Sequence, residues 1–150
     1  RYPRGQAEGV ELPENFSRIE IGKARVLREG NDVAVLTFGP LGNAAARAID
    51  RANAKGISVM HADMRFAKPL DESLLHDIGK RFKKVITVED GAIKGGFGSG
   101  VLEFFDANGY NSSVKMIGIG DAFVGHGTPA ELYEACGMDE AGIYRTITAG

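Results

Sequence analysis

The sequence predicts an α/β fold of three layers, α/β/α, in which helices cover both faces of a mostly parallel five-stranded sheet with one antiparallel edge strand. Two observations support this prediction. Apolar, β-branched runs alternate along the chain with stretches whose apolar residues recur at helical spacing. Glycines make up 21 of the 150 residues, about twice the usual share, and most stand between these segments, where turns are needed.

Residues 84–105 show the alternation most clearly. The apolar run at 85–88 predicts a strand, and residues 89–91 predict a turn. A glycine cluster at 95–100 then leads into a helix with apolar residues at 101–105. Strand, loop and helix in this order form the repeating unit of a parallel sheet, so this segment indicates the fold class of the whole chain.

The chain enters the sheet through a short charged segment at 22–30, which we interpret as an edge strand. Residues 30–32 predict a hairpin turn, so we expect this strand to pair antiparallel with the next one, the apolar run at 33–38. The remaining strands are expected at 57–60, 85–88 and 113–119. Four parallel strands are thus joined by three helical crossovers.

Helical spacing places the first helix at 41–54. Its core-facing residues should be Ala45, Ala48, Ile49 and Ala52. Two later helices begin after residues suited to an N-cap, Asp71 and Thr128 (followed by proline), and a short closing helix is expected to start near Asp139. We expect His76, on the second helix, to face solvent.

Composition argues against several classes of function. The net charge is −2 and no basic cluster is visible, whereas nucleic-acid binding usually needs one. No apolar run approaches the length of a membrane span. The single cysteine, Cys136, excludes an internal disulfide, so we expect a cytoplasmic protein in which this thiol is a small core residue.

Ligands of open parallel sheets usually bind beyond the carboxyl ends of the strands. Three predicted strand ends carry acidic or imidazole side chains: His61 with Asp63, Glu89 with Asp90, and Asp121 with His126. Their carboxylates could hold Mg²⁺, although capping of the following turn is the more common use of such residues. The histidines, His76 included, lack the spacing of metal ligands, and His126 between two glycines is the freest to reach a neighbour.

The glycine cluster at 95–100 suggests a phosphate-binding loop, because amides at the start of a helix bind anions. The details differ from known phosphate loops: Gly100 is followed by Val101 rather than Lys-Ser/Thr, and the third glycine of the dinucleotide fingerprint is absent. We therefore favour close packing of the helix against another part of the backbone.

The first five residues, RYPRG, place Arg1 and Arg4 in an extended segment. Arginine is suited to phosphate or carboxylate recognition, although spacing alone favours a solvated terminus.

Five segments in this order, RYPRG, IGKARVLREGNDVAVLTFG, DMRFAKPLDE, TVEDGAIKGGFGSGV and IGIGDAFVGHGT, resemble the C-terminal domain of the 1-deoxy-D-xylulose-5-phosphate synthase family. That family belongs to the transketolase-like enzymes that use thiamine diphosphate. The resemblance covers nearly the whole chain. It implies residues 1–20 as an extended linker from a preceding domain and residues 21–150 as a transketolase C-terminal-like domain.

The resemblance also implies a reaction, in which pyruvate and glyceraldehyde 3-phosphate condense to 1-deoxy-D-xylulose 5-phosphate with loss of CO₂. The product feeds isoprenoid, thiamine and pyridoxal biosynthesis. In this family thiamine diphosphate and Mg²⁺ are held by the preceding domains of a homodimer, so this chain alone is expected to bind neither and to be inactive. Arg4 matches the arginine that contacts the phosphate of the aldehyde substrate, and no catalytic or metal residue is expected.

Two other interpretations stay open. The chain could be a stand-alone, flavodoxin-like binding or regulatory domain. It could also be the corresponding domain of another thiamine-diphosphate enzyme, such as a transketolase or the β-subunit of a 2-oxo-acid dehydrogenase; the DMRFAKPLDE segment argues for the synthase over these.

Overall fold

The structure, a computed structural model, describes residues 14–149. The strands are β1 (Arg25–Arg28), β2 (Val33–Phe38), β3 (Val59–Asp63), β4 (Lys84–Ala92) and β5 (Ser113–Ile119). The helices are α1 (Gly42–Asn53), α2 (Glu72–Arg81), α3 (Phe97–Ala107), α4 (Pro129–Ala135) and α5 (Glu140–Thr148).

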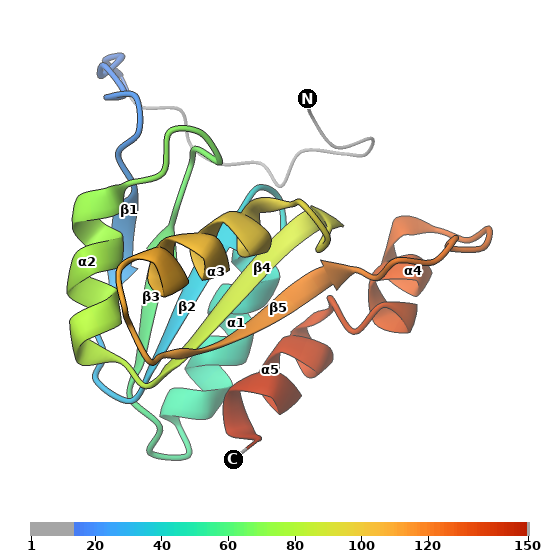
Figure 1. Ribbon diagram of the computed structural model, residues 1–150. Coiled ribbons are helices and arrows are strands. Elements are labelled where there is room, and N and C mark those ends of the chain that lie inside the picture. Colours follow the sequence, from blue (N-terminus) through green and yellow to red (C-terminus); the bar gives the residue numbers. More distant parts are fainter. Residues whose placement is uncertain (1–13, 150) are drawn as a thin grey trace.

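All five strands form one sheet in the order β1-β3-β2-β4-β5, and β1 alone among them runs antiparallel. Figure 1 shows α2 and α3 on one face of this sheet and α1 and α5 on the other. The predicted three-layer architecture with an antiparallel edge strand is therefore confirmed.

Each face of the sheet has its own apolar core. The core under α1 and α5 contains the four residues predicted on the first helix, all fully buried: Ala45, Ala48, Ile49 and Ala52. The core under α2 and α3 includes Leu75 and Ile78 from α2 and Phe105 from α3. Alternate residues of the central strands contribute to both cores, which explains why these strands are apolar without interruption.

The predicted partner of the edge strand is wrong, because β1 pairs with β3 and not with β2. Residues 30–32 do not fold back as a hairpin; they cross the start of β3, where the amides of Asn31 and Asp32 donate to the carbonyl of Ser58 at 3.2 and 2.8 Å. The Asp32 carboxylate accepts the Ser58 amide in return. A side chain at Gly30 would overlap the backbone between Val59 and Met60, so glycine permits this crossing.

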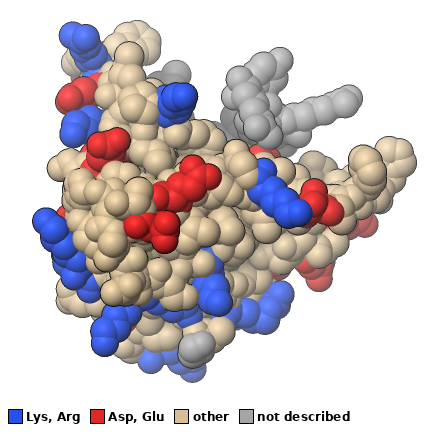
Figure 2. Space-filling model, viewed as in Figure 1, with Lys and Arg blue, Asp and Glu red and all other residues tan. Residues whose placement is uncertain are grey.

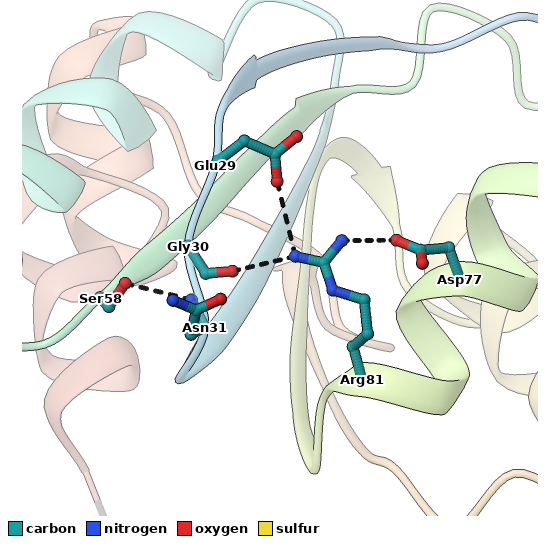
Figure 3. A network of polar contacts seen from close by, with 6 residues as sticks. All are labelled: Glu29, Gly30, Asn31, Ser58, Asp77 and Arg81. Atoms are coloured by element: carbon teal, nitrogen blue, oxygen red, sulfur yellow. Dashed lines mark hydrogen bonds and ion pairs between the residues drawn. The ribbon is translucent and has the colours of Figure 1, made fainter.

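Arg81 at the end of α2 also contacts the segment that crosses β3 (Figure 3). Its guanidinium donates to the carbonyl of Gly30 at 3.2 Å and to the carboxylate of Asp77 at 2.6 Å, and it lies 3.5 Å from that of Glu29. The segment that leads to β2 is therefore held by contacts from both β3 and α2.

Two strands are longer than predicted. β3 continues to Asp63, and β4 continues through residues 89–91, which the sequence suggests as a turn. Pairing explains the second difference, because β4 is still bonded to β5 at Ala92 after an irregularity that follows Val88. An irregularity of this kind accommodates extra residues within a strand, which explains why the local sequence of these residues predicts a turn.

The predicted exposure of His76 is also wrong. The ring is half-buried, its Nδ1 lies 2.8 Å from the hydroxyl of Tyr110, and it packs edge-on against Phe104. The predicted N-caps Asp71 and Thr128 are confirmed, since each side chain accepts an amide from the first turn of its helix. Asp139, near which the closing helix is expected to start, caps α5 in the same way. Among the described residues, no helix is long and apolar enough to cross a bilayer.

Candidate functional site

The acidic residues singled out from the sequence lie in the last part of the parallel strands or just beyond their carboxyl ends. Arg4, the predicted phosphate ligand, lies outside the described residues, as does Arg1. Asp63 and Glu89 stand in the last part of β3 and in β4, and Asp121 follows β5. The structure thus lets each strand end be assessed by the contacts that its side chains make.

Glu89 anchors the glycine cluster. Its carboxylate is almost fully buried and accepts the amides of Phe97 and Gly98, the first two residues of α3, both at 2.8 Å. A carboxylate at this position offsets the positive end of the helix and satisfies two amides that have no partner within the helix. The loop amides that could bind a phosphate are therefore already occupied by a side chain of the protein itself.

The glycines of this cluster allow the helix to approach the sheet. A side chain at Gly98 would meet the hydroxyl of Thr87 at 2.5 Å and the Met116 side chain at 2.8 Å. At Gly96 it would overlap the Ala92 carbonyl and the Glu89 carboxylate. The packing interpretation is confirmed at these two positions.

The other strand-end carboxylates have separate partners. Asp63 accepts the amide of Arg65 at 3.2 Å and lies 3.7 Å from the guanidinium of Arg25. Asp121 lies 2.5 Å from the ammonium group of Lys94. The two carboxylates therefore have different partners and do not form one site. Each is explained by a hydrogen bond or an ion pair with a nearby residue.

Asp90 accepts the hydroxyl of Tyr133 at 2.9 Å, which ties β4 to α4. Burial, and then the hydrogen bond and negative charge of Asp90, raise the pKa of the Tyr133 phenol above its ordinary value. The phenol is therefore neutral at physiological pH and acts as a hydrogen-bond donor.

Thiamine diphosphate with Mg²⁺ needs a set of oxygen ligands for the metal. Within residues 14–149, no group of three His, Cys, Asp or Glu side chains is arranged to hold a metal ion.

His61 is buried against Thr37, with its Nε2 3.1 Å from the threonine hydroxyl. Burial lowers the pKa of the imidazole to about 4, partly opposed by Asp63 and supported by Arg28. The ring is therefore neutral at pH 7. It lines a small pocket of about 220 Å³ with Asp63 and the start of α1. His126, by contrast, is exposed in the loop after β5.

Sequence reasoning missed a pair of contacts made by the DMRFAKPLDE segment. The Arg65 guanidinium donates to the carbonyl of Ala24 at 2.9 Å, and the second oxygen of the Asp71 carboxylate accepts the amide of Ala24 at 3.0 Å. We call Arg65 and Asp71 the Ala24 clamp. Arg65 has a positive φ of 55°, which is uncommon for a residue with a side chain.

The Ala24 clamp fixes the point at which the chain enters the sheet. Asp71 also caps α2 through its other oxygen, so one carboxylate connects the entry of β1 with the helix that follows β3. The DMRFAKPLDE segment stands out in the sequence by its charged residues, but nothing local indicates that their partner lies more than 40 residues upstream.

A model of the transketolase C-terminal domain matches residues 22–143 of the chain. The chain belongs to the transketolase C-terminal domain family. Its fold agrees with a solved structure described as a split gene transketolase in an inactive beta4 tetramer, with a TM-score of 0.81 and 33% identity over 91% of this chain and 45% of that chain.

Curated relatives of this family member are 1-deoxy-D-xylulose-5-phosphate synthases. That of Bacteroides fragilis is 54% identical over 99% of the chain, and that of Phocaeicola vulgatus is 55% identical over 98%. That of Cytophaga hutchinsonii is 48% identical over 98%. In each comparison the chain spans 23% of the relative, or about a quarter of its length.

Proposed function

We propose that this chain is the C-terminal domain of a 1-deoxy-D-xylulose-5-phosphate synthase, which condenses pyruvate with glyceraldehyde 3-phosphate and releases CO₂. The observation that carries the proposal is the 54% identity to a synthase over 99% of the chain. The product would serve isoprenoid, thiamine and pyridoxal biosynthesis in the cytoplasm.

The chemistry belongs to the longer polypeptide in this proposal. Thiamine diphosphate supplies the carbanion chemistry on pyruvate when it is bound, and we assign it, with Mg²⁺, to the preceding domains of a homodimer. The domain described here contributes a rigid three-layer body whose entry point is held by the Ala24 clamp. Residues 1–20 act as the linker from the preceding domain, and residues 21–150 form the domain.

Arg4 is the proposed contact to the phosphate of the aldehyde. Its guanidinium can donate two parallel hydrogen bonds to phosphate oxygens, a geometry that lysine cannot reproduce. Pyruvate has no phosphate, so the two substrates should depend on Arg4 to different degrees.

The test is steady-state kinetics of the full-length enzyme with Arg4→Ala. The KM for glyceraldehyde 3-phosphate should rise by about ten- to a hundredfold, because a charge-assisted contact is lost, while the KM for pyruvate stays unchanged. Arg18→Ala, an exposed arginine in the same N-terminal segment, is the matched control and should change neither KM. Equal rises for both substrates would refute the phosphate role of Arg4.

A transketolase is the second candidate, favoured by the 33% identity to the split gene transketolase. Product analysis separates the two. Release of CO₂ from pyruvate identifies a synthase, whereas transfer of a two-carbon unit between sugar phosphates without pyruvate identifies a transketolase.

A further inference from the structure

A groove lies between β5 and α5, on the face of the sheet that carries α1. It has a volume of about 680 Å³, within the range typical of small-molecule sites. β5 is the last strand of the sheet, and α5 packs mainly against α1, which leaves the groove open between α5 and the outer edge of β5. The lining of the groove includes Ile117 and three glycines.

Three cations from three different elements line this groove: Lys84 of β4, Lys115 of β5 and Arg145 of α5. No Asp or Glu is among the lining residues. Figure 2 shows Lys and Arg side chains gathered along the lower edge of the view, near the C-terminal end of α5. The charge of the groove is therefore positive, although the net charge of the whole chain is −2.

The three cations differ in the partners that they have within the protein. The Lys84 ammonium donates to the carbonyls of Ile147 and Ala149, which leaves it one further N–H. Within residues 14–149, neither Lys115 nor Arg145 has a carboxylate within ion-pair distance. Burial, and then the charge of Lys115, lower the pKa of Lys84, as expected for two cations held close together.

The opposite flank of α5 makes a useful contrast. There Arg47 and Arg51 of α1 both donate to the carboxylate of Glu140, at 3.2 and 3.0 Å. Arg51 also stacks on the ring of Tyr144. Arg47 and Arg51 are thus paired with a carboxylate, whereas Lys115 and Arg145 are not paired with any carboxylate of residues 14–149.

We infer that the groove between β5 and α5 binds a phosphate monoester with a compact apolar body, its phosphate between Lys115 and Arg145 and its apolar part against Ile117 and the glycines that line the groove. A phosphate dianion offsets more of the charge of three cations than a carboxylate does, and arginine can bind it with two hydrogen bonds. This inference does not depend on the reaction proposed above.

The test is titration of the ¹⁵N-labelled 150-residue chain with phenyl phosphate, followed by NMR. Saturable shifts are expected at amides of 113–118 and 142–146. Lys115→Gln and Arg145→Gln should each weaken binding by about tenfold, the effect of losing one charge-assisted contact of about 1.4 kcal/mol. Arg47→Gln removes the same charge on the paired flank of α5 and should leave the affinity unchanged.

Comparison ligands decide the ligand class. Benzoate and inorganic phosphate should each bind more weakly than phenyl phosphate, because one lacks the second charge and the other lacks the apolar body. Equal weakening by Arg47→Gln would show general charge attraction and overturn the inference. So would an absence of saturable shifts, or tight binding of an acidic peptide without binding of phenyl phosphate, which would indicate strand addition to β5.

Discussion

Two neighbouring strand ends carry the same local sequence pattern and differ completely in packing. After β4 and after β5, a glycine-rich loop leads into a helix at whose start a glutamate accepts backbone amides: Glu89 accepts those of Phe97 and Gly98, and Glu131 accepts that of the N-cap Thr128. After β4 the glutamate is Glu89, buried and part of the sheet, and α3 buries four residues: Phe97, Gly98, Val101 and Phe105. After β5 the glutamate is Glu131, an exposed residue of the helix itself, and α4 buries none.

The glycines differ in the same way. Gly96 and Gly98 have no room for a side chain, whereas Gly120 and Gly125 of the β5–α4 loop face open space. Phe123 in that loop is fully exposed (Figure 1 shows the loop and α4 extending away from the sheet). The comparison teaches that a glycine-rich loop before a helix does not by itself indicate either a ligand site or tight packing. The two loops differ in where the glutamate lies: it belongs to the strand before the tightly packed helix α3, and to the helix itself in the exposed α4.

The capping carboxylates should give the largest difference. Glu89→Ala leaves two buried amides without an acceptor, and we expect it to lower the free energy of unfolding by about 4 kcal/mol. Glu131→Ala should leave global stability unchanged, because α4 is held by few other contacts and unfolds locally. Urea denaturation of both variants measures the two changes in the free energy of unfolding. Similar losses in Glu89→Ala and Glu131→Ala would contradict the difference in packing.

The histidines should give a difference that depends on pH. The pKa of His61 is about 4 in the folded chain and about 6.5 when unfolded, so the unfolded chain binds the proton more readily. The stability that neutral His61 contributes is complete above about pH 6.5 and falls by up to about 3 kcal/mol as the pH drops to 4. Denaturation of His61→Gln between pH 7 and 4 should show a shallower loss of stability than the parent chain. The exposed His126→Gln should keep the parent's slope; a change of slope there would contradict the assignment to His61.

The glycines should give the smallest difference. Gly98→Ala forces its new methyl group against Thr87 and Met116, and should cost about 2 kcal/mol through overpacking. Gly125→Ala meets no atom within 4 Å and should change stability by less than about 0.5 kcal/mol. Thermal unfolding of the two variants is sufficient, and an equal effect at both positions would show that Gly98 is not closely packed.

Local signals in the sequence were enough for most of the fold. Apolar runs predict the five strands, and the predicted N-caps at Asp71 and Thr128 are correct because a cap depends only on residues within one helical turn. The order of the strands in the sheet could not be predicted in full from local signals. β1 pairs with β3 because of contacts at Ser58, which lies 26 positions after Asp32, and no turn signal can show this.

The candidate site shows the same limit. The Ala24 clamp depends on contacts over 41 and 47 positions, and the environment of His76 depends on Tyr110, which lies 34 positions away. Family resemblance supplied Arg4, which no residue pattern could identify, and its role stays a prediction because residues 1–13 are outside the described part of the chain.

The pairing of β1 with β3 also has a consequence during synthesis of the chain, because β1 is made before its partner strand. Arg25 of β1 pairs with Asp63 of β3, which is translated 38 residues later. At about 5–20 residues per second, β1 leaves the ribosome about two to eight seconds before its partner strand does. During that time β1 is unpaired, and its arginines at 25 and 28 are charges of the kind that discourage pairing with another chain.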